Sequence, residues 1–555
     1  MRALFRPLPR AVTRPLSILM LLAWAAVLAA LVNRSYLQAS SASLATELAR
    51  YGSGAIWRGV YYRGEKIGFT VSQTVPNGDG FDLEEDGRLQ MSMLGATTAA
   101  TIRTTAHVDA RFTLHAFEFS LDPGTGPIEV RGRIDGRRLT LDVKTPSGTR
   151  TETRDLEEPP ALSLNLSRVL ANGGLIPGAR HRWTVFDPAT LRNAPVEVSV
   201  GKRELVRGAN MPIPAFRVEM AFAGLRTTSW VTDSGEIVRE ESPLGLITVR
   251  ESAEMARAMA VSRRMQVDLL QAAAIVPRMQ TRVSEPRDVR RMRLRFDGLD
   301  RAELLAADLD GAPQRFDGSV MELRDPQDLK AERRDPDIAR YLAAETFIES
   351  DAPEIRSEAE TAVRGVTGVR ERAERLTRYV NALLDKKPTV SLPSAREVLR
   401  TKVGDCNEHT ALYVAMARAL GIPARIVVGL VYIHGAFYYH AWPEVYLDEG
   451  PSPLPEPQGR PEAGRGAPPG AGLWLPVDPT LNEFPADATH IRLARGGLEK
   501  QAVILPLIGR LKIEVLEVEL APNTTPILVG KPPADLGALA IPIPRRESSC
   551  CACPR

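Results

Sequence analysis

The sequence predicts an α+β protein with an N-terminal membrane helix, a large antiparallel β domain and a second domain that contains helices followed by antiparallel strands. Three features support this prediction: an uncharged run near the N-terminus, a long middle region in which apolar and polar residues alternate, and a later region in which helical spacing changes to alternation. At about 150 residues per domain, the 555 residues correspond to roughly three or four domains.

Composition narrows the possible partners. The 71 Lys and Arg residues nearly balance the 68 Asp and Glu residues, which leaves a formal charge of +3. Because proteins that bind polyanions usually carry a strongly basic surface, we expect no nucleic acid partner. Of the four cysteines, Cys550, Cys551 and Cys553 crowd the C-terminus, so Cys406 is the one thiol in the body of the chain. A disulfide framework is excluded, and the surroundings of Cys406 become the first place to search for chemistry.

The N-terminal stretch has the pattern of a membrane segment. Four arginines precede the uncharged run Leu16–Val32; they are Arg2, Arg6, Arg10 and Arg14. The length of the run fits either a short spanning helix or a long signal-peptide core. We favour a retained anchor over a cleaved signal, because the small residues at Ala39–Ser43 lie well past the run. By the positive-inside rule, the protein is expected to be a single-pass inner (cell) membrane protein whose body lies outside the cytoplasm, in the periplasm.

A β-rich domain is predicted for residues 57–255. Apolar residues at Leu139, Leu141 and Val143 alternate with polar ones, and turn signals such as Asp135-Gly136 separate the alternating stretches. We expect a large antiparallel sheet that is curved or closed. His107 and His115 stand alone in this region and are expected to be structural.

The remaining organisation follows from changes in pattern and composition. The basic strand expected at 289–296 is interpreted as a solvated sheet face rather than a patch for anionic polymers, and the Cys-ended terminus as a disordered tail rather than a metal or lipid site. The predicted segments are a cytoplasmic stub with the membrane segment (1–33), a linker (34–56), the β-rich domain (57–255), a helical and strand connector (256–334), a second α+β domain (335–520) with a Pro/Gly-rich insertion (448–472), and the tail (521–555).

A helix is predicted to begin at Cys406. Asp405 is a favourable N-cap, Glu408 completes a capping-box pattern, and Gly421 followed by Pro423 ends the helix. A cysteine in the first turn meets the positive end of the helix dipole and free backbone N–H groups, which favour the thiolate and offer donors to an oxyanion. This position suits a nucleophile; the alternative is an inert buried cysteine.

A histidine and an aspartate are predicted to meet across a hairpin beyond this helix. If Tyr446 pairs with Gly472, His440 lies directly opposite Asp478, and the carboxylate can orient the imidazole. The expected strands are 437–447 and 473–479, joined by the insertion.

Neighbouring residues receive supporting roles. Trp442 and Glu444 share the strand face of His440 and are expected to shield and hold the pair, and His409 is expected to be structural. Neither metal-ligand spacing nor a phosphate-binding glycine loop is found, so we expect no cofactor and no metal.

These motifs resemble the transglutaminase-like superfamily of papain-type cysteine enzymes. The resemblance rests on GDCNEHTALYVAMARALGIPARIVVG, HAWPEVY and LWLPVDPT in that order, and it covers about Asp335 to Gly496. It implies Cys406 as nucleophile, His440 as base and Asp478 as orienting acid, and a fold in which the Cys helix packs on an antiparallel sheet. The insertion between the last two motifs departs from the family pattern.

The function implied is that of a membrane-tethered, periplasmic cysteine enzyme acting on amide bonds of a peptide or protein. Release of the acyl group to water would make it a hydrolase, as an amidase or cysteine protease, and release to an amine would make it an acyltransferase. The alternatives are a non-catalytic transglutaminase-like scaffold and a module that binds an envelope ligand. We expect the membrane, reached through the N-terminal helix, as a further partner.

Overall fold

The computed structural model divides the chain into two compact units, Met1–Ile56 and Trp57–Arg555. It describes residues 51–528 except 53, 94–95, 124–125, 190, 208–210, 223–224, 244, 259–272, 334, 388–393, 449–470, 497–503, 505–506 and 523–526. In the described part, no helix combines the length and apolar character that a membrane span needs. The run Leu16–Val32, on which the predicted membrane helix depends, lies outside the described residues, as do the Cys-ended terminus and most of the insertion.

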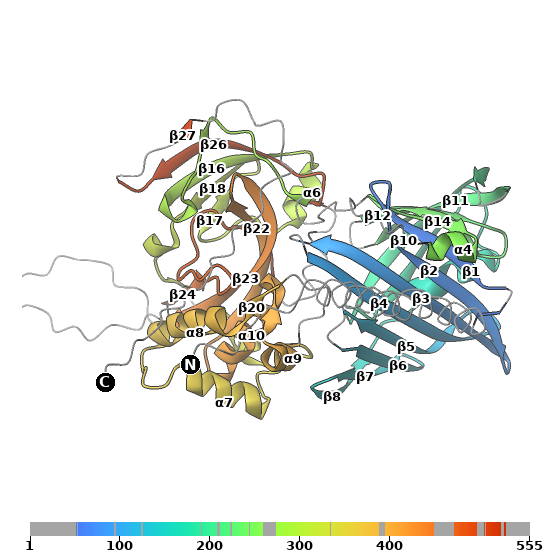
Figure 1. Ribbon diagram of the computed structural model, residues 1–555, viewed down its shortest axis with the longest axis horizontal. Helices are drawn as coiled ribbons and strands as arrows, with labels where there is room; N and C mark the ends of the chain where they lie inside the picture. The colour runs from blue at the N-terminus through green and yellow to red at the C-terminus, as the bar shows by residue number, and fades with distance from the viewer. Residues whose placement is uncertain are drawn as a thin grey trace, which may run out of the picture. The chain divides into compact units, whose positions relative to one another are not determined.

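The β-rich domain is a meandering antiparallel sheet, as the alternation predicted. The described strands follow the order β8 to β1 and then β14 to β9, so the two halves join where Trp57 pairs with Glu251. Figure 1 shows the curvature of this sheet. Its strands are β1 (Ile56–Tyr62), β2 (Glu65–Asn77), β3 (Gly80–Met93), β4 (Ala96–Asp109), β5 (Leu114–Asp122), β6 (Ile128–Asp135), β7 (Arg138–Thr145), β8 (Gly148–Asp155), β9 (Arg180–Asp187), β10 (Arg192–Arg207), β11 (Pro212–Phe222), β12 (Leu225–Val231), β13 (Ile237–Glu241) and β14 (Leu246–Glu251).

Alternation of side chains builds the core of this sheet. In β7, the exposed fractions of Leu139, Leu141 and Val143 are 0%, 0% and 2%, which confirms the predicted buried face. Helix α3 (Ser163–Ala171) packs Leu166 and Leu170 against the valines of β10, β11 and β12. A short helix, α4 (Ala253–Arg257), follows the last strand.

Strands of the connector form a small antiparallel sheet with β26, which comes from the end of the predicted second domain, in the order β17-β18-β16-β26. In β16, Met292 and Leu294 are buried, while Arg291 and Arg295 form ion pairs with glutamates of β18 and β26 at 2.8 and 3.0 Å. The basic face is therefore neutralised within the sheet, in agreement with the solvated-face interpretation. The elements are η2 (Pro286–Asp288), β16 (Val289–Asp297), α6 (Arg301–Ala306), β17 (Gln314–Phe316), β18 (Val320–Arg324), η3 (Pro326–Asp328) and β26 (Lys512–Leu520); β15 (Thr281–Arg282) pairs separately with β27 (Ile527–Leu528).

The second α+β domain holds a sheet in the order β19-β24-β23-β22-β25, with α10 packed on β22 and β23. Helices α7, α8 and α9 surround α10 (Figure 1), so its residues 408–418 are all buried rather than confined to one apolar stripe. The elements are β19 (Glu332–Arg333), η4 (Ile338–Leu342), α7 (Pro353–Ala362), α8 (Val369–Leu383), β20 (Asp385–Lys386), α9 (Ala395–Thr401), β21 (Val403–Gly404), α10 (Cys406–Ala419), β22 (Ala424–Ile433), β23 (Ala436–Asp448), β24 (Ala471–Pro476) and β25 (Ile491–Gly496).

The predicted hairpin register is wrong by two residues. Tyr446 pairs with Trp474, not with Gly472, and the β23–β24 ladder ends where Glu444 pairs with Pro476. Asp478 therefore follows the strand instead of lying within it. Because side chains alternate with a period of two, a shift of two residues keeps every side chain on its expected face.

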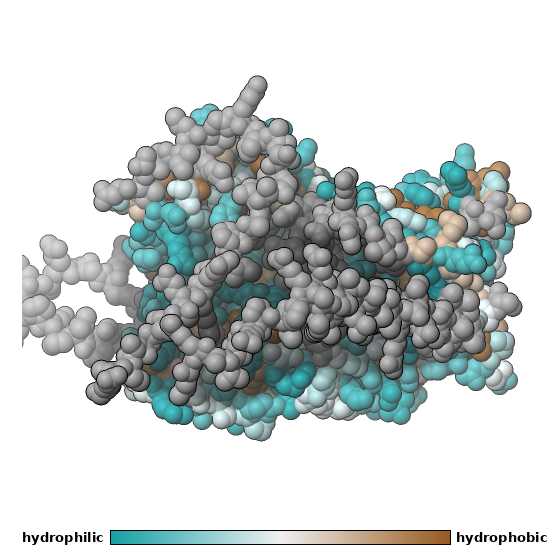
Figure 2. Space-filling view, in the orientation of Figure 1, coloured by the Kyte–Doolittle hydropathy of each residue, from teal (hydrophilic) through white to brown (hydrophobic). Residues whose placement is uncertain are grey.

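Hydrophilic residues cover most of the described surface on the face shown in Figure 2. This distribution agrees with the burial of the large apolar side chains between the sheets and helices.

Gly429 of β22 creates the space in which the side chains of β23 lie. It pairs with His440, and a Cβ atom there would lie 1.9 Å from the carbonyl oxygen of Ile491 and 2.9 Å from Cη2 of Trp442. Neither the backbone of β25 nor the buried indole can retreat without disturbing the sheet.

We predict that Gly429→Ala lowers the free energy of unfolding by about 1–3 kcal/mol, because it overpacks a filled core. Urea denaturation measures this loss. Gly87→Ala is the matched control: its Cβ would meet Thr70 Cγ2 at an ordinary 3.5 Å, and it should be nearly neutral. Equal stability of the two variants would contradict the prediction.

Candidate active site

Helix α10 begins at Cys406, as the capping pattern predicted. The carboxylate of Asp405 accepts a hydrogen bond from the backbone N–H of Asn407 at 2.9 Å and from that of Glu408. In return, the Glu408 side chain accepts the backbone N–H of Asp405 at 2.9 Å. This reciprocal cap fixes the first turn and therefore the position of the thiol.

The expectation that the helix start favours a thiolate is wrong. Desolvation within the protein raises the pKa of Cys406 well above its ordinary value, and the nearby carboxylates of Asp405, Glu408 and Asp478 raise it further. A hydrogen bond with the backbone of Ala441 opposes these effects only in part. The N–H groups of Asn407 and Glu408, expected to be free for an oxyanion, are taken by Asp405. The resting group is a neutral thiol.

Two contacts join the start of α10 to β23 beside His440. The Cys406 thiol hydrogen-bonds with the backbone of Ala441, and the Thr410 hydroxyl donates to the Ala441 carbonyl at 3.1 Å. Ala441 is the residue after His440, so the helix presents its cysteine to the strand segment that carries the histidine.

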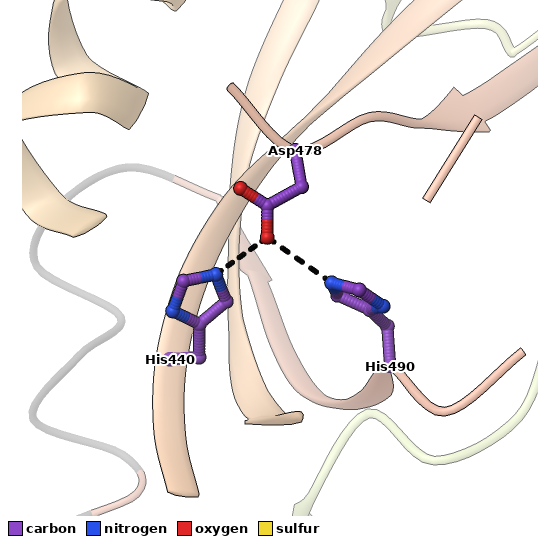
Figure 3. Close-up of side chains that lie close together, drawn as sticks. All are labelled: His440, Asp478 and His490. Carbon is purple, nitrogen blue, oxygen red and sulfur yellow. Dashed lines mark hydrogen bonds and ion pairs between the residues drawn. The ribbon is translucent and has the colours of Figure 1, made fainter. Parts of the chain in front are cut away.

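His440 and Asp478 are in direct contact, as the sequence predicted. His440 Nε2 lies 2.6 Å from Asp478 Oδ2, and the side chains are only 8% and 0% exposed (Figure 3). A carboxylate can only accept, so Nε2 carries the proton and donates it. In the neutral ring, Nδ1 is then the basic nitrogen. The catalytic role of this pair stays a prediction.

Asp478 accepts hydrogen bonds at both of its oxygens. Its Oδ1 accepts the backbone N–H groups of Thr480 and Leu481 at 2.7 and 2.9 Å, and its Oδ2 accepts from His440 and from His490, the latter at 3.1 Å. Burial alone would raise the pKa of Asp478, but the charge and hydrogen bond of His440, followed by those of His490, lower it far below its ordinary value. The carboxylate is therefore ionised and fixed.

Hydrogen bonds within the loop after Asp478 and from helix α8 fix the backbone of this loop. Backbone hydrogen bonds in both directions close it between Asp478 and Glu483, at 2.9 and 2.8 Å. From α8, Asn381 donates to the carbonyls of Pro479 and Thr480 at 2.7 and 3.1 Å. The aspartate thus has a fixed backbone although it lies outside the strand.

Trp442 lies against both imidazoles. Its ring is nearly parallel to His440 at 6.1 Å between centroids and perpendicular to His490 at 5.1 Å. At 1% exposure, this indole covers the pair, in agreement with the expected shielding role. Glu444 does not hold the pair: it binds the Arg425 guanidinium at 2.6 Å and lies 3.7 Å from Arg492.

His490 is the residue that sequence reasoning missed. It directly precedes β25, and its Nδ1 lies 3.2 Å from both the side-chain and the backbone oxygen of Asp487. The spacing of Asp487 and His490 by three residues was the available signal, but nothing in the sequence places them next to Asp478. His409, expected to be structural, is fully buried and hydrogen-bonds through Nδ1 with the backbone oxygen of Asp405 at 2.6 Å.

Two groups in the described part have ligand atoms close enough to share a metal ion, although the sequence has no metal-ligand spacing. They are His440, Asp478 and His490, and Glu483, Asp487 and His490. In both groups His490 already donates to carboxylates through both ring nitrogens, which leaves it no lone pair for a metal. These residues fit a hydrogen-bonded network better than a metal site.

A cysteine that begins a helix, packed on an antiparallel sheet with a bonded histidine and aspartate, is the arrangement of a transglutaminase-like core. Residues 356–479 match the family model described as Transglutaminase-like superfamily, and this segment includes Cys406, His440 and Asp478. The match confirms the resemblance drawn from the motifs. A comparison with curated proteins finds no match.

Solved structures similar to the chain share little sequence with it. A "Putative Cysteine Protease" from Cytophaga hutchinsonii is 15% identical, with a TM-score of 0.26 over 44% of this chain and 90% of its own. The periplasmic domain of TgpA from Pseudomonas aeruginosa, bound to ethylmercury, is 17% identical, with a TM-score of 0.21 over 36% and 93%. A β-barrel-like protein of a domain of unknown function from Brucella abortus is 14% identical, with a TM-score of 0.28 over 36% and 95%.

We predict that Asp405→Asn accelerates alkylation of Cys406 about three- to ten-fold below the pKa of the thiol. Asparagine keeps the helix cap but removes a negative charge, which lowers that pKa. Iodoacetamide labelling across pH 6 to 10, followed by mass spectrometry of the Cys406 peptide, measures the rate.

Asp405→Ala is the matched control. It also removes the charge but loses the cap, so it should accelerate labelling while costing about 1 kcal/mol of stability. Unchanged labelling rates in both variants would show that the carboxylate does not hold the thiol neutral.

Proposed function

We propose that the protein is a membrane-tethered, extracytoplasmic cysteine enzyme of transglutaminase-like type that acts on amide bonds of a peptide or protein. The observation that carries the proposal is the short hydrogen bond between His440 and the ionised Asp478, next to the strand segment that contacts Cys406. The family match over 356–479 supports the same reaction class.

The raised pKa of the thiol determines how the reaction begins. Because the resting cysteine is neutral, Nδ1 of His440 removes the thiol proton as the sulfur attacks the carbonyl carbon. The imidazolium formed is stabilised by Asp478 and then donates its proton to the leaving amine. The product of this half-reaction is a thioester on Cys406.

The second half-reaction releases the acyl group. Water, or an amine acceptor, gives a proton to His440 as it attacks the thioester, and His440 then passes that proton to the departing sulfur, which restores the thiol and the neutral imidazole. Hydrolysis and transfer therefore use the same residues and differ only in the acceptor.

We predict that Cys406→Ala abolishes acyl transfer, with a loss of at least about 10³-fold, while the fold is kept. His440→Ala should lose about as much, and Asp478→Asn should retain more, because residues that act as a unit are not additive. Hydroxylamine converts any acyl-enzyme formed from a peptide amide into a hydroxamate. The assay therefore detects the enzyme whether its natural acceptor is water or an amine.

The matched control replaces Cys550, Cys551 and Cys553 by serine and should keep full activity. Hydroxamate formation that persists in Cys406→Ala would leave the non-catalytic scaffold or the ligand-binding module as the better explanation. Mass spectrometry of the Cys406 peptide from denatured enzyme adds a direct test for the thioester.

The membrane tether rests on the uncharged run Leu16–Val32 and the arginines before it. We predict that the full chain stays in the membrane fraction after washing with alkaline carbonate and that its N-terminal sequence begins before residue 16. A soluble mature chain that starts near Ser43 would exclude the anchor and leave export in place.

A further inference from the structure

His490 is a buried histidine that takes no part in any step of the proposed mechanism. Its side chain is 2% exposed, and it lies beside the same Asp478 oxygen that His440 contacts (Figure 3). A buried polar ring needs partners for both of its nitrogens.

The partners of His490 determine its protonation state. Nε2 lies 3.1 Å from Asp478 Oδ2, and Nδ1 lies 3.2 Å from Asp487 Oδ1 and from the Asp487 backbone oxygen. Asp478 and Asp487, the carboxylates that contact His490, are ionised acceptors, and a backbone carbonyl also can only accept. Both nitrogens must therefore carry protons, which makes the ring an imidazolium.

The electrostatics of the cluster agree with this state. Burial alone would lower the pKa of His490, but its hydrogen bonds to Asp478 and Asp487, with the charges of Asp487 and Glu483, raise it well above its ordinary value. Glu483 in turn is paired with Arg287 at 3.0 Å.

Two aromatic rings also lie against His490. The edge of Trp442 packs against the ring, and the His440 ring lies 6.1 Å away. His440 and a charged His490 thus share one oxygen of one carboxylate, and the indole that contacts both rings is itself buried.

We propose that His490 is a positioning residue: a permanent imidazolium that holds Asp478 Oδ2 on His440 and limits how strongly His440 holds a proton. The proposal rests on the proposed function and assigns this residue a role in it. When His440 takes the thiol proton, it becomes a second cation against the same oxygen. The repulsion between the two rings favours passing that proton on to the leaving amine.

Histidine NMR tests the proposal without requiring turnover. In protein labelled with ¹³C at the histidine ε1 carbon, the seven histidines give one signal each. The His490 signal should have the shift of an imidazolium and should not titrate between pH 5 and 8. In His490→Gln, which can donate to Asp478 but carries no charge, the midpoint of the His440 titration should rise by about one pH unit.

Two further variants make the test specific. In His490→Asn, the shorter amide can reach only Asp487. This variant should therefore show the same rise of the His440 midpoint as His490→Gln, but a larger loss of kcat than His490→Gln. His181→Gln makes the same substitution in the β-rich domain and should change neither the His440 midpoint nor kcat. If His490→Gln does not fold, Asp487→Asn replaces it: removing that carboxylate should bring the His490 titration down into the measured range.

The pH dependence of the free energy of unfolding supplies a second readout, and the proposal determines the direction of the change. A histidine whose folded pKa is raised stabilises the protein fully below the unfolded pKa of about 6.5, and this contribution is lost as the pH rises through the folded value. The stability difference between wild type and His490→Gln should therefore shrink as the pH rises above about 6.5.

The outcomes separate the two proposals. A His490 signal that titrates near pH 6.5, or an unchanged His440 midpoint in His490→Gln and His490→Asn, overturns the positioning role even if the enzyme is active. If hydroxamate formation is absent in the wild type but the NMR results are as expected, the proposed function fails and the charge coupling between the two rings stands.

Discussion

The buried carboxylate of Asp478 is the group on which the arrangement of the site depends. An isolated carboxylate could not remain ionised in this interior, yet backbone N–H groups hold one oxygen and two imidazoles hold the other. Hydrogen bonds to charged groups contribute about 1.5–3 kcal/mol each. The loop after β24, the start of β25 and His440 on β23 are therefore held together through one side chain.

The start of α10 shows a conflict between stability and reactivity. The carboxylate of Asp405 closes the first turn of the helix, but the same charge lies beside the thiol and raises its pKa. An alanine would lower the pKa of the thiol but would lose the cap. In the proposed mechanism a neutral thiol needs a base close by, and the His440–Asp478 pair would supply it.

The sequence predicted what local rules determine and missed what long-range packing determines. The beginning of α10 was predicted because its cap residues are neighbours in the chain, and the strands because alternation is local. The register failed because the insertion before β24 removes the turn geometry that would fix it. Even so, the His440–Asp478 contact was found, since an error of two residues keeps both side chains on one face. His490 was missed because only the folded loop brings it to Asp478.

Burial around the pair also determines from which side a substrate can approach. Asp478, His490 and Trp442 are at most 2% exposed, and the residues of α10 after its first turn are buried as well. Cys406 retains partial exposure at the start of the helix. In the proposed reaction a carbonyl group would then arrive from the side of the thiol, while the buried imidazolium and carboxylates lie away from it. Charges in such a dry environment interact more strongly than at a surface, which is the condition under which one fixed cation can adjust the basicity of its neighbour.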